Sequence, residues 1–192
     1  MEMSEPSRAE DRLLASALRA YERGRARWAL GMAVPVLVLP LASWLLGGHP
    51  VLMCVLGGAL FAIAALLLWR GEAWGRGVGL GLAAGLIPFG LVHVARCSSY
   101  ICTESMCFSI CLAACVIGGV AAGVIVTSAV RRTSWSMPVL AATTGVAFLT
   151  GTLACGCVGA WGVAALATGL ATSVAAAWVL ARVRPLPPGA NP

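Results

Sequence analysis

Six long apolar stretches dominate this sequence. A helix needs roughly 20 mostly apolar residues to cross about 30 Å of hydrocarbon, and each stretch has about that length and contains no Asp, Glu or Arg. Because the connections between the stretches are short, consecutive helices should be antiparallel neighbours. The sequence therefore predicts an all-α integral membrane bundle of six transmembrane helices. The expected spans are residues 28–47, 50–69, 77–95, 107–130, 137–155 and 159–181.

Composition supports lipid as the solvent. Only 10% of the 192 residues are charged, whereas soluble domains carry about 25%. The net charge of +6 does not indicate direct nucleic-acid binding, because the charges lie in short patches between apolar runs. The N-terminus lacks the pattern of a cleaved secretory signal, so the segment 28–46 is expected to remain as a span.

The placement of arginine predicts the orientation. Alternating connections put twelve of the thirteen Arg residues on one side, with both termini, and only Arg96 on the other. The positive-inside rule makes the Arg-rich side cytoplasmic, in the cell's inner (cytoplasmic) membrane, and the Trp residues fall at the two predicted boundaries. We expect a cytoplasmic amphipathic helix over 1–27, a transmembrane domain over 28–181 and a cytoplasmic Pro-rich tail over 182–192.

Small residues are expected to control packing in the bundle. Two rows of glycine recur at helical spacing and let helix backbones approach closely in lipid. The same Gly-rich faces would also let two copies of the chain pack as a homo-oligomer. Prolines in the first and third spans predict kinks. The glycines are 77, 81 and 85, and 119 and 123; the prolines are 35, 40 and 88.

The N-terminal helix carries one apolar stripe, formed by Leu14, Leu18 and Tyr21. Spacing of i, i+4 and i+7 places the three side chains on one face. Such a stripe suits either the lipid bilayer surface or the groove of a cytoplasmic protein partner. Periodicity does not separate these two interpretations.

Elimination narrows the chemistry to thiols and imidazoles. The chain has no Lys, and no Asp or Glu within the predicted spans. Proton-coupled transport would need carboxylates in the spans, and a serine-type triad would need an acid beside a His. No catalytic residue is predicted, and an enzyme is the less favoured class.

All eight cysteines and both histidines map to the predicted outer loops or the outer half of a span. A site at the outer end of the bundle is expected to draw on Cys107, Cys111, Cys155 and Cys157, with His93. The wider set of metal or redox candidates is Cys97, Cys102, Cys107, Cys111, Cys115, Cys155, Cys157, His93 and His49.

Three interpretations of this set stay open. Outer cysteines often pair as structural disulfides. Cys and His also bind transition metals, here zinc or copper. A reactive redox centre is the third interpretation.

The layout resembles that of six-helix inner-membrane anti-sigma factors, the negative regulators of extracytoplasmic-function sigma factors. The matching features are the short tail 1–27, Cys107 before the fourth span, the Arg131-Arg132 turn and Cys155 closing the fifth span. The resemblance implies that the N-terminal segment holds a sigma factor and that outer cysteines respond to metal or redox stress.

The leading functional hypothesis is an extracytoplasmic metal or redox sensor that relays to a cytoplasmic partner through the N-terminal helix. The alternatives are a membrane thiol-disulfide oxidoreductase or small metal-ion carrier, and a structural membrane protein with stapling disulfides.

Overall fold

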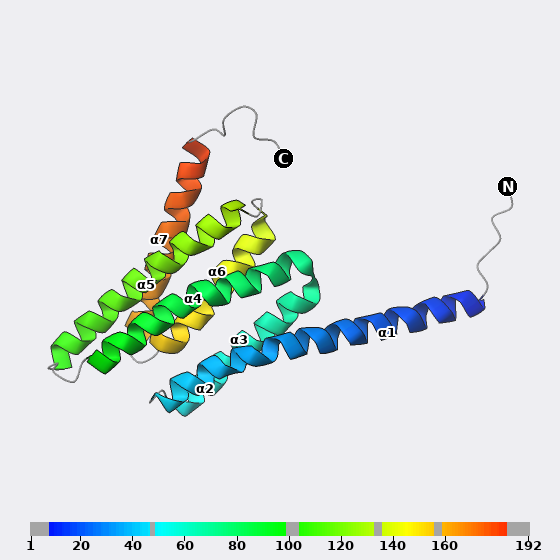
Figure 1. The fold of residues 1–192 in the computed structure, drawn as a ribbon, viewed down its shortest axis with the longest axis horizontal. Coiled ribbons are helices and arrows are strands. Elements are labelled where there is room, and N and C mark those ends of the chain that lie inside the picture. The colour runs from blue at the N-terminus through cyan, green and yellow to red at the C-terminus, as the bar shows by residue number, and fades with distance from the viewer. Residues whose placement is uncertain (1–7, 47–48, 99–103, 133–135, 156–158, 184–192) are drawn as a thin grey trace.

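The computed structural model describes residues 8–46, 49–98, 104–132, 136–155 and 159–183, and these residues form helices with no strand among them (Figure 1). Side chains at several helix ends (8–12, 72–73, 96–98, 104–107, 130–132 and 181–183) lie outside the description. The elements are α1 (Arg8–Ala33), the short 3₁₀ helix η1 (Val34–Leu37), α2 (Val38–Leu45), α3 (Pro50–Arg70), α4 (Glu72–Ser98), α5 (Glu104–Arg132), α6 (Met137–Cys155) and α7 (Ala160–Val183).

Six helical segments in the described chain are long and apolar enough to cross a membrane, which confirms the predicted fold class. Large apolar side chains such as Val55, Val94 and Ile117 are more than 60% exposed on the outside of the bundle. Such a surface is a liability in water but suits contact with lipid tails. The chain thus fits a multi-pass membrane protein. The segments are Leu13–Leu45, Pro50–Arg70, Trp74–Ala95, Phe108–Ala129, Met137–Cys155 and Ala160–Leu180.

Helix α6 forms the centre of the bundle, with eleven of its residues buried. Helix α4 lies directly against it because glycines on α4 leave no side chain in the contact. A Cβ at Gly77 would lie 3.1 Å from the Val139 carbonyl oxygen, and one at Gly81 would lie 2.6 Å from that of Thr143. The predicted close packing along this glycine row is therefore found within the chain.

The second glycine row joins α5 to α7. A Cβ at Gly119 would lie 2.6 Å from the Leu166 carbonyl oxygen, and Gly169 of α7 approaches the α5 backbone at Val116 equally closely. Both predicted Gly-rich faces are thus occupied by helices of the same chain, so they give no support to a homo-oligomer formed through them.

The first span is not one regular helix. It changes to 3₁₀ geometry at Val34–Leu37, where Pro35 stands near the start, and resumes as α2. A proline removes a backbone donor and its ring disturbs the preceding helical turn. Pro40 then packs against Gly57 of α3, where an added Cβ would lie 2.6 Å from the ring. In α4, by contrast, Pro88 lies inside the helix without ending it.

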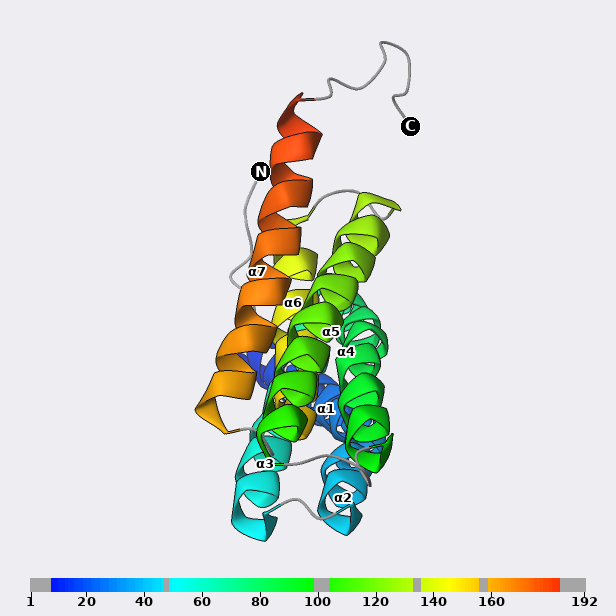
Figure 2. The ribbon, with the colours of Figure 1, turned by 90° about the vertical axis from the view of Figure 1, so that its left-hand side faces the viewer.

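The bundle has two chemically different ends. At one end, here called the Arg-rich end, α3 finishes at Arg70 and α4 begins at Glu72. At the opposite end, here called the cysteine end, α6 finishes at Cys155. Helix α1 passes the Arg-rich end and extends well beyond the other helices (Figure 1), whereas α2 and α3 lie side by side at the cysteine end (Figure 2).

Candidate functional site

Two buried cysteines meet toward the cysteine end of the bundle. The Sγ atoms of Cys115, on α5, and Cys155, the last residue of α6, are 2.7 Å apart. Both residues are fully buried, and they share an apolar cluster with Val92 of α4, Ala154 of α6 and Leu166 of α7. The thiol pair therefore lies where α4, α5, α6 and α7 all contribute to one core.

Glycines beside the pair allow the helices to come this close. Gly118 follows Cys115 by three residues, and a Cβ there would lie 2.7 Å from the Cβ of Pro88 on α4. Gly151 precedes Cys155 by one turn, and its added Cβ would lie 3.3 Å from the Cγ of Pro88. The Pro88 ring fills the space at Gly118, and the Leu166 side chain and the Pro88 ring together fill the space at Gly151.

The sulfur separation places the pair between contact and bond. A disulfide has an S–S distance of about 2.03–2.05 Å, so at 2.7 Å the two sulfurs lie close together without being joined by a disulfide. Among the cysteines whose side chains are described, no two lie at disulfide distance. The predicted stapling disulfides therefore stay a prediction.

The expected site paired Cys155 with Cys107 and Cys111 of α5, and the structure brings Cys115 of the same helix to Cys155. Cys111 lies one turn before Cys115 and is half-buried. Helix α5 begins eleven residues before Cys115. At a rise of about 1.5 Å per residue, Cys115 therefore lies roughly 16 Å along the axis from the start of α5. Helix α6 has no such extension, since it ends at Cys155, and so its last residue meets the deeper cysteine.

The other candidate cysteines are only partly described. Cys102 and Cys157 lie outside the described residues, and Cys97 and Cys107 lie in helices but their side chains do not belong to the description. Cys54, on α3, is exposed. No group of three or more His, Cys, Asp or Glu side chains that would hold a metal occurs among the described residues. The zinc or copper hypothesis thus has no support in this part of the chain.

The two histidines have different surroundings. Nδ1 of His93 donates a hydrogen bond to the Phe89 carbonyl oxygen at 2.7 Å, one turn earlier in α4. The two rings also pack, with centroids 4.4 Å apart. His93 is half-buried, and this bond fixes its proton on Nδ1 because a carbonyl oxygen only accepts. His49 is exposed and stands immediately before α3.

A polar contact connects the first span to the thiol pair. The hydroxyl of Ser43, on α2, donates to the Leu153 carbonyl oxygen at 3.0 Å, and Ser43 is buried. Leu153 precedes Cys155 by two residues. The last four carbonyls of a helix lack a partner within it, so Ser43 satisfies one of these groups on α6. Sequence reasoning missed this residue; its only signal is a serine inside an apolar span.

The apolar stripe on α1 is exposed on the surface of the protein. Leu14, Leu18 and Tyr21 are each at least 60% exposed. Leu18 and Tyr21 also border a pocket of 420 Å³ with Trp69 and Arg70 at the end of α3. Figure 1 shows the N-terminal half of α1 extending away from the bundle.

Comparison with protein-family models, with curated proteins and with solved structures finds no match to this chain. The features of this chain that bear on function are the buried thiol pair, the hydrogen bond from Ser43 to Leu153 and the exposed stripe of α1.

Proposed function

We propose that this chain is a redox-responsive membrane protein in which Cys115 and Cys155 switch between a dithiol and a disulfide. The observation that carries the proposal is the 2.7 Å separation of the two buried sulfurs. Formation of the bond needs a shift of well under 1 Å in that distance, since a disulfide measures about 2.03–2.05 Å.

The oxidant is best described as a small hydroperoxide, because a neutral molecule can enter lipid. One thiol attacks the peroxide, its O–O bond breaks, and a sulfenic acid forms with release of water or an alcohol. The second thiol then displaces the hydroxyl of the sulfenic acid, so that the S–S bond forms and a second water leaves. Two electrons and both thiol hydrogens pass to the peroxide, which balances the reaction.

The connection from the thiols to the first span supports a relay. Closing the S–S bond draws the end of α6 toward α5. That movement alters the position of the Leu153 carbonyl, which Ser43 holds from α2. Because α1, η1 and α2 follow one another without a break, a displacement of α2 changes how α1 leaves the bundle.

The exposed stripe of α1 is the proposed output. Leu14, Leu18 and Tyr21 suit a helix-in-groove contact with a protein. The split of arginines favours a cytoplasmic position for this helix, with the bundle in the inner membrane. The resemblance to anti-sigma factors suggests a sigma factor as the partner, with outer cysteines as the stress-sensitive element.

Burial argues against the competing functions. A thiol-disulfide oxidoreductase needs a thiol that a protein substrate can reach, but Cys115 and Cys155 are both 0% exposed. A metal carrier would need ligands beyond Cys115 and Cys155, and no group of three occurs among the described residues. A purely structural disulfide differs in its expected behaviour: it would stay oxidised under all conditions, whereas the proposed Cys115–Cys155 pair changes its redox state.

Trypsin digestion of α1 tests the relay. Helix α1 contains Arg8, Arg12, Arg19, Arg23, Arg25 and Arg27, and full-length protein in inside-out vesicles offers them to the protease. We expect hydroperoxide to change the cleavage rate at least about threefold in wild type and to have no effect in Cys115→Ser. Cys54→Ser is the matched control and should respond like wild type. Equal rates before and after oxidation in wild type would refute the relay.

A further inference from the structure

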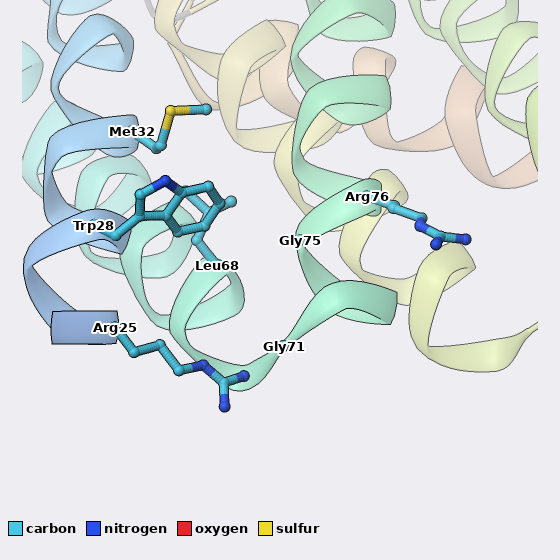
Figure 3. A pocket seen from close by; sticks show the side chains of 7 residues that line it. All are labelled: Arg25, Trp28, Met32, Leu68, Gly71, Gly75 and Arg76. Atoms are coloured by element: carbon cyan, nitrogen blue, oxygen red, sulfur yellow. The ribbon is translucent and has the colours of Figure 1, made fainter. Parts of the chain in front are cut away.

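Two pockets that share Arg25 lie at the Arg-rich end, where α1 passes the turn between α3 and α4, and Figure 3 shows the first of them. One has a volume of 410 Å³ and is walled by Trp28, Met32 and Leu68. The other has a volume of 420 Å³ and includes Arg70 in its lining. Arg25 borders both pockets. The junction thus combines an apolar wall with two guanidinium groups.

The backbone makes room for Arg25. Gly71, which ends α3, has φ +130°, a conformation that side chains with a Cβ rarely adopt. A Cβ at Gly71 would lie 2.8 Å from Nη2 of Arg25. In Figure 3 the Arg25 guanidinium extends from α1 to this turn, whereas Arg76 lines the pocket from α4 with its guanidinium turned to the other side.

The two guanidinium groups at this junction, those of Arg25 and Arg70, form no ion pair with a described carboxylate. Among the side chains that the structure describes, neither Arg25 nor Arg70 has a carboxylate within ion-pair distance, and Glu22 is the acidic residue lining the second pocket. The guanidinium of Arg70 is held 5.9 Å from the centre of the Trp74 ring, a cation–π arrangement. Planar guanidinium groups bind phosphate oxygens in a bidentate manner.

We infer that this junction binds an anionic phospholipid of the leaflet at the Arg-rich end, independently of the thiol pair. Arg25 and Arg70 would take the phosphate, and Trp28, Met32 and Leu68 would contact an acyl chain. Arginine and tryptophan at a span boundary are suited to this level of the bilayer. The bound lipid bridges α1 to the end of α3 and so sets the direction in which α1 leaves the membrane.

Native mass spectrometry of the full-length protein in detergent tests the site. Phosphatidylglycerol and phosphatidylcholine with identical acyl chains are titrated separately, and their apparent Kd values are compared. We expect phosphatidylglycerol to bind at least about tenfold more tightly, because charge-assisted bidentate bonds are the stronger kind. The variant R25Q/R70Q should lose this preference. The variant R19Q/R23Q removes the same charge from α1 residues that do not line either pocket and should keep the preference.

Three outcomes would overturn the inference. They are equal binding of the two lipids by wild type, an equal loss of preference in R19Q/R23Q, and complete displacement of phosphatidylglycerol by an equal concentration of inorganic phosphate. The last result would identify soluble phosphate as the ligand and leave the apolar wall without a role. If R25Q/R70Q does not fold, R25K/R70K replaces it. Lysine keeps both charges but loses bidentate geometry, so a reduced preference supports the site and an unchanged one contradicts it.

Discussion

The hydroxyl of Ser43 donates a hydrogen bond to the carbonyl oxygen of Leu153 across 3.0 Å, although the two residues are 110 positions apart. This contact joins the first span to the last turn of α6, two residues from Cys155. It is the most direct polar connection described between the N-terminal helix and the thiol pair.

Ser43→Ala should uncouple the N-terminal helix from the thiol pair. Loss of the hydrogen bond leaves the Leu153 carbonyl without this donor, and we expect a destabilisation of about 0.5–1.5 kcal/mol. The larger effect should be on the relay: hydroperoxide still oxidises the thiols, but the trypsin sensitivity of α1 no longer changes. Ser128→Ala removes an exposed serine that bonds only to its own helix, at Ile125, and should behave like wild type. An intact relay in Ser43→Ala would assign the coupling to other contacts.

Gly118→Ala should push α5 away from α4. The added Cβ would lie 2.7 Å from Pro88, and crowding of this kind in a packed core costs about 1–3 kcal/mol. The thermal unfolding midpoint in detergent should fall, and disulfide formation between Cys115 and Cys155 should slow. Gly145→Ala serves as the control, since no atom lies within 4 Å of its added Cβ. Equal behaviour of the two variants would contradict the packing account.

Leu18→Asp should abolish partner binding without affecting the bundle. Leu18 is 60% exposed, so its replacement removes no core contact, but a charge in the stripe opposes docking into an apolar groove. Ser16→Asp puts the same charge on the opposite face of α1 and should bind normally. Titration of full-length protein with the proposed partner, a purified extracytoplasmic-function sigma factor from the same cell, gives the readout. Tight binding by Leu18→Asp would exclude the stripe as the contact surface.

The orientation is tested by labelling in intact cells. In a cysteine-free background, a cysteine at Trp161, near the start of α7, should react with a membrane-impermeant maleimide from outside. A cysteine at Met137, at the start of α6 and the opposite end of the bundle, should react only after the membrane is opened. Both positions are about 70% exposed, so accessibility within the protein does not separate them. Labelling of Met137→Cys from outside would reverse the predicted topology.

The sequence predicted the helical fold well because span length and the exclusion of charge are local properties. Apolar stretches of about 20 residues determine the helices almost independently of how they pack. The glycine rows also predicted close packing, since a missing Cβ is the main requirement for backbone contact in lipid. Their partners, α6 and α7 of the same chain, depend on the rotation of each helix and were not predictable.

The site was harder to predict because it also depends on how the helices are placed relative to one another. Cys115 and Cys155 were both candidates, but their pairing depends on how far α5 extends past the end of α6. Periodicity gives the face of a helix that a cysteine occupies, not the depth at which two helices meet. Ser43 and Arg25 escaped notice because a single polar residue in or beside a span has no distinctive spacing.

Measuring the redox state of Cys115 and Cys155 tests the proposed switch most directly. Membranes containing the full-length protein are treated with dithiothreitol or with hydroperoxide, quenched in acid, alkylated under denaturing conditions and digested for mass spectrometry. We expect Cys115 and Cys155 to be alkylated after reduction and to appear as one disulfide-linked peptide pair after oxidation, with Cys54 alkylated in both samples. If Cys115 and Cys155 stay alkylated after oxidation, or if each is linked to a different cysteine, the proposed switch is wrong.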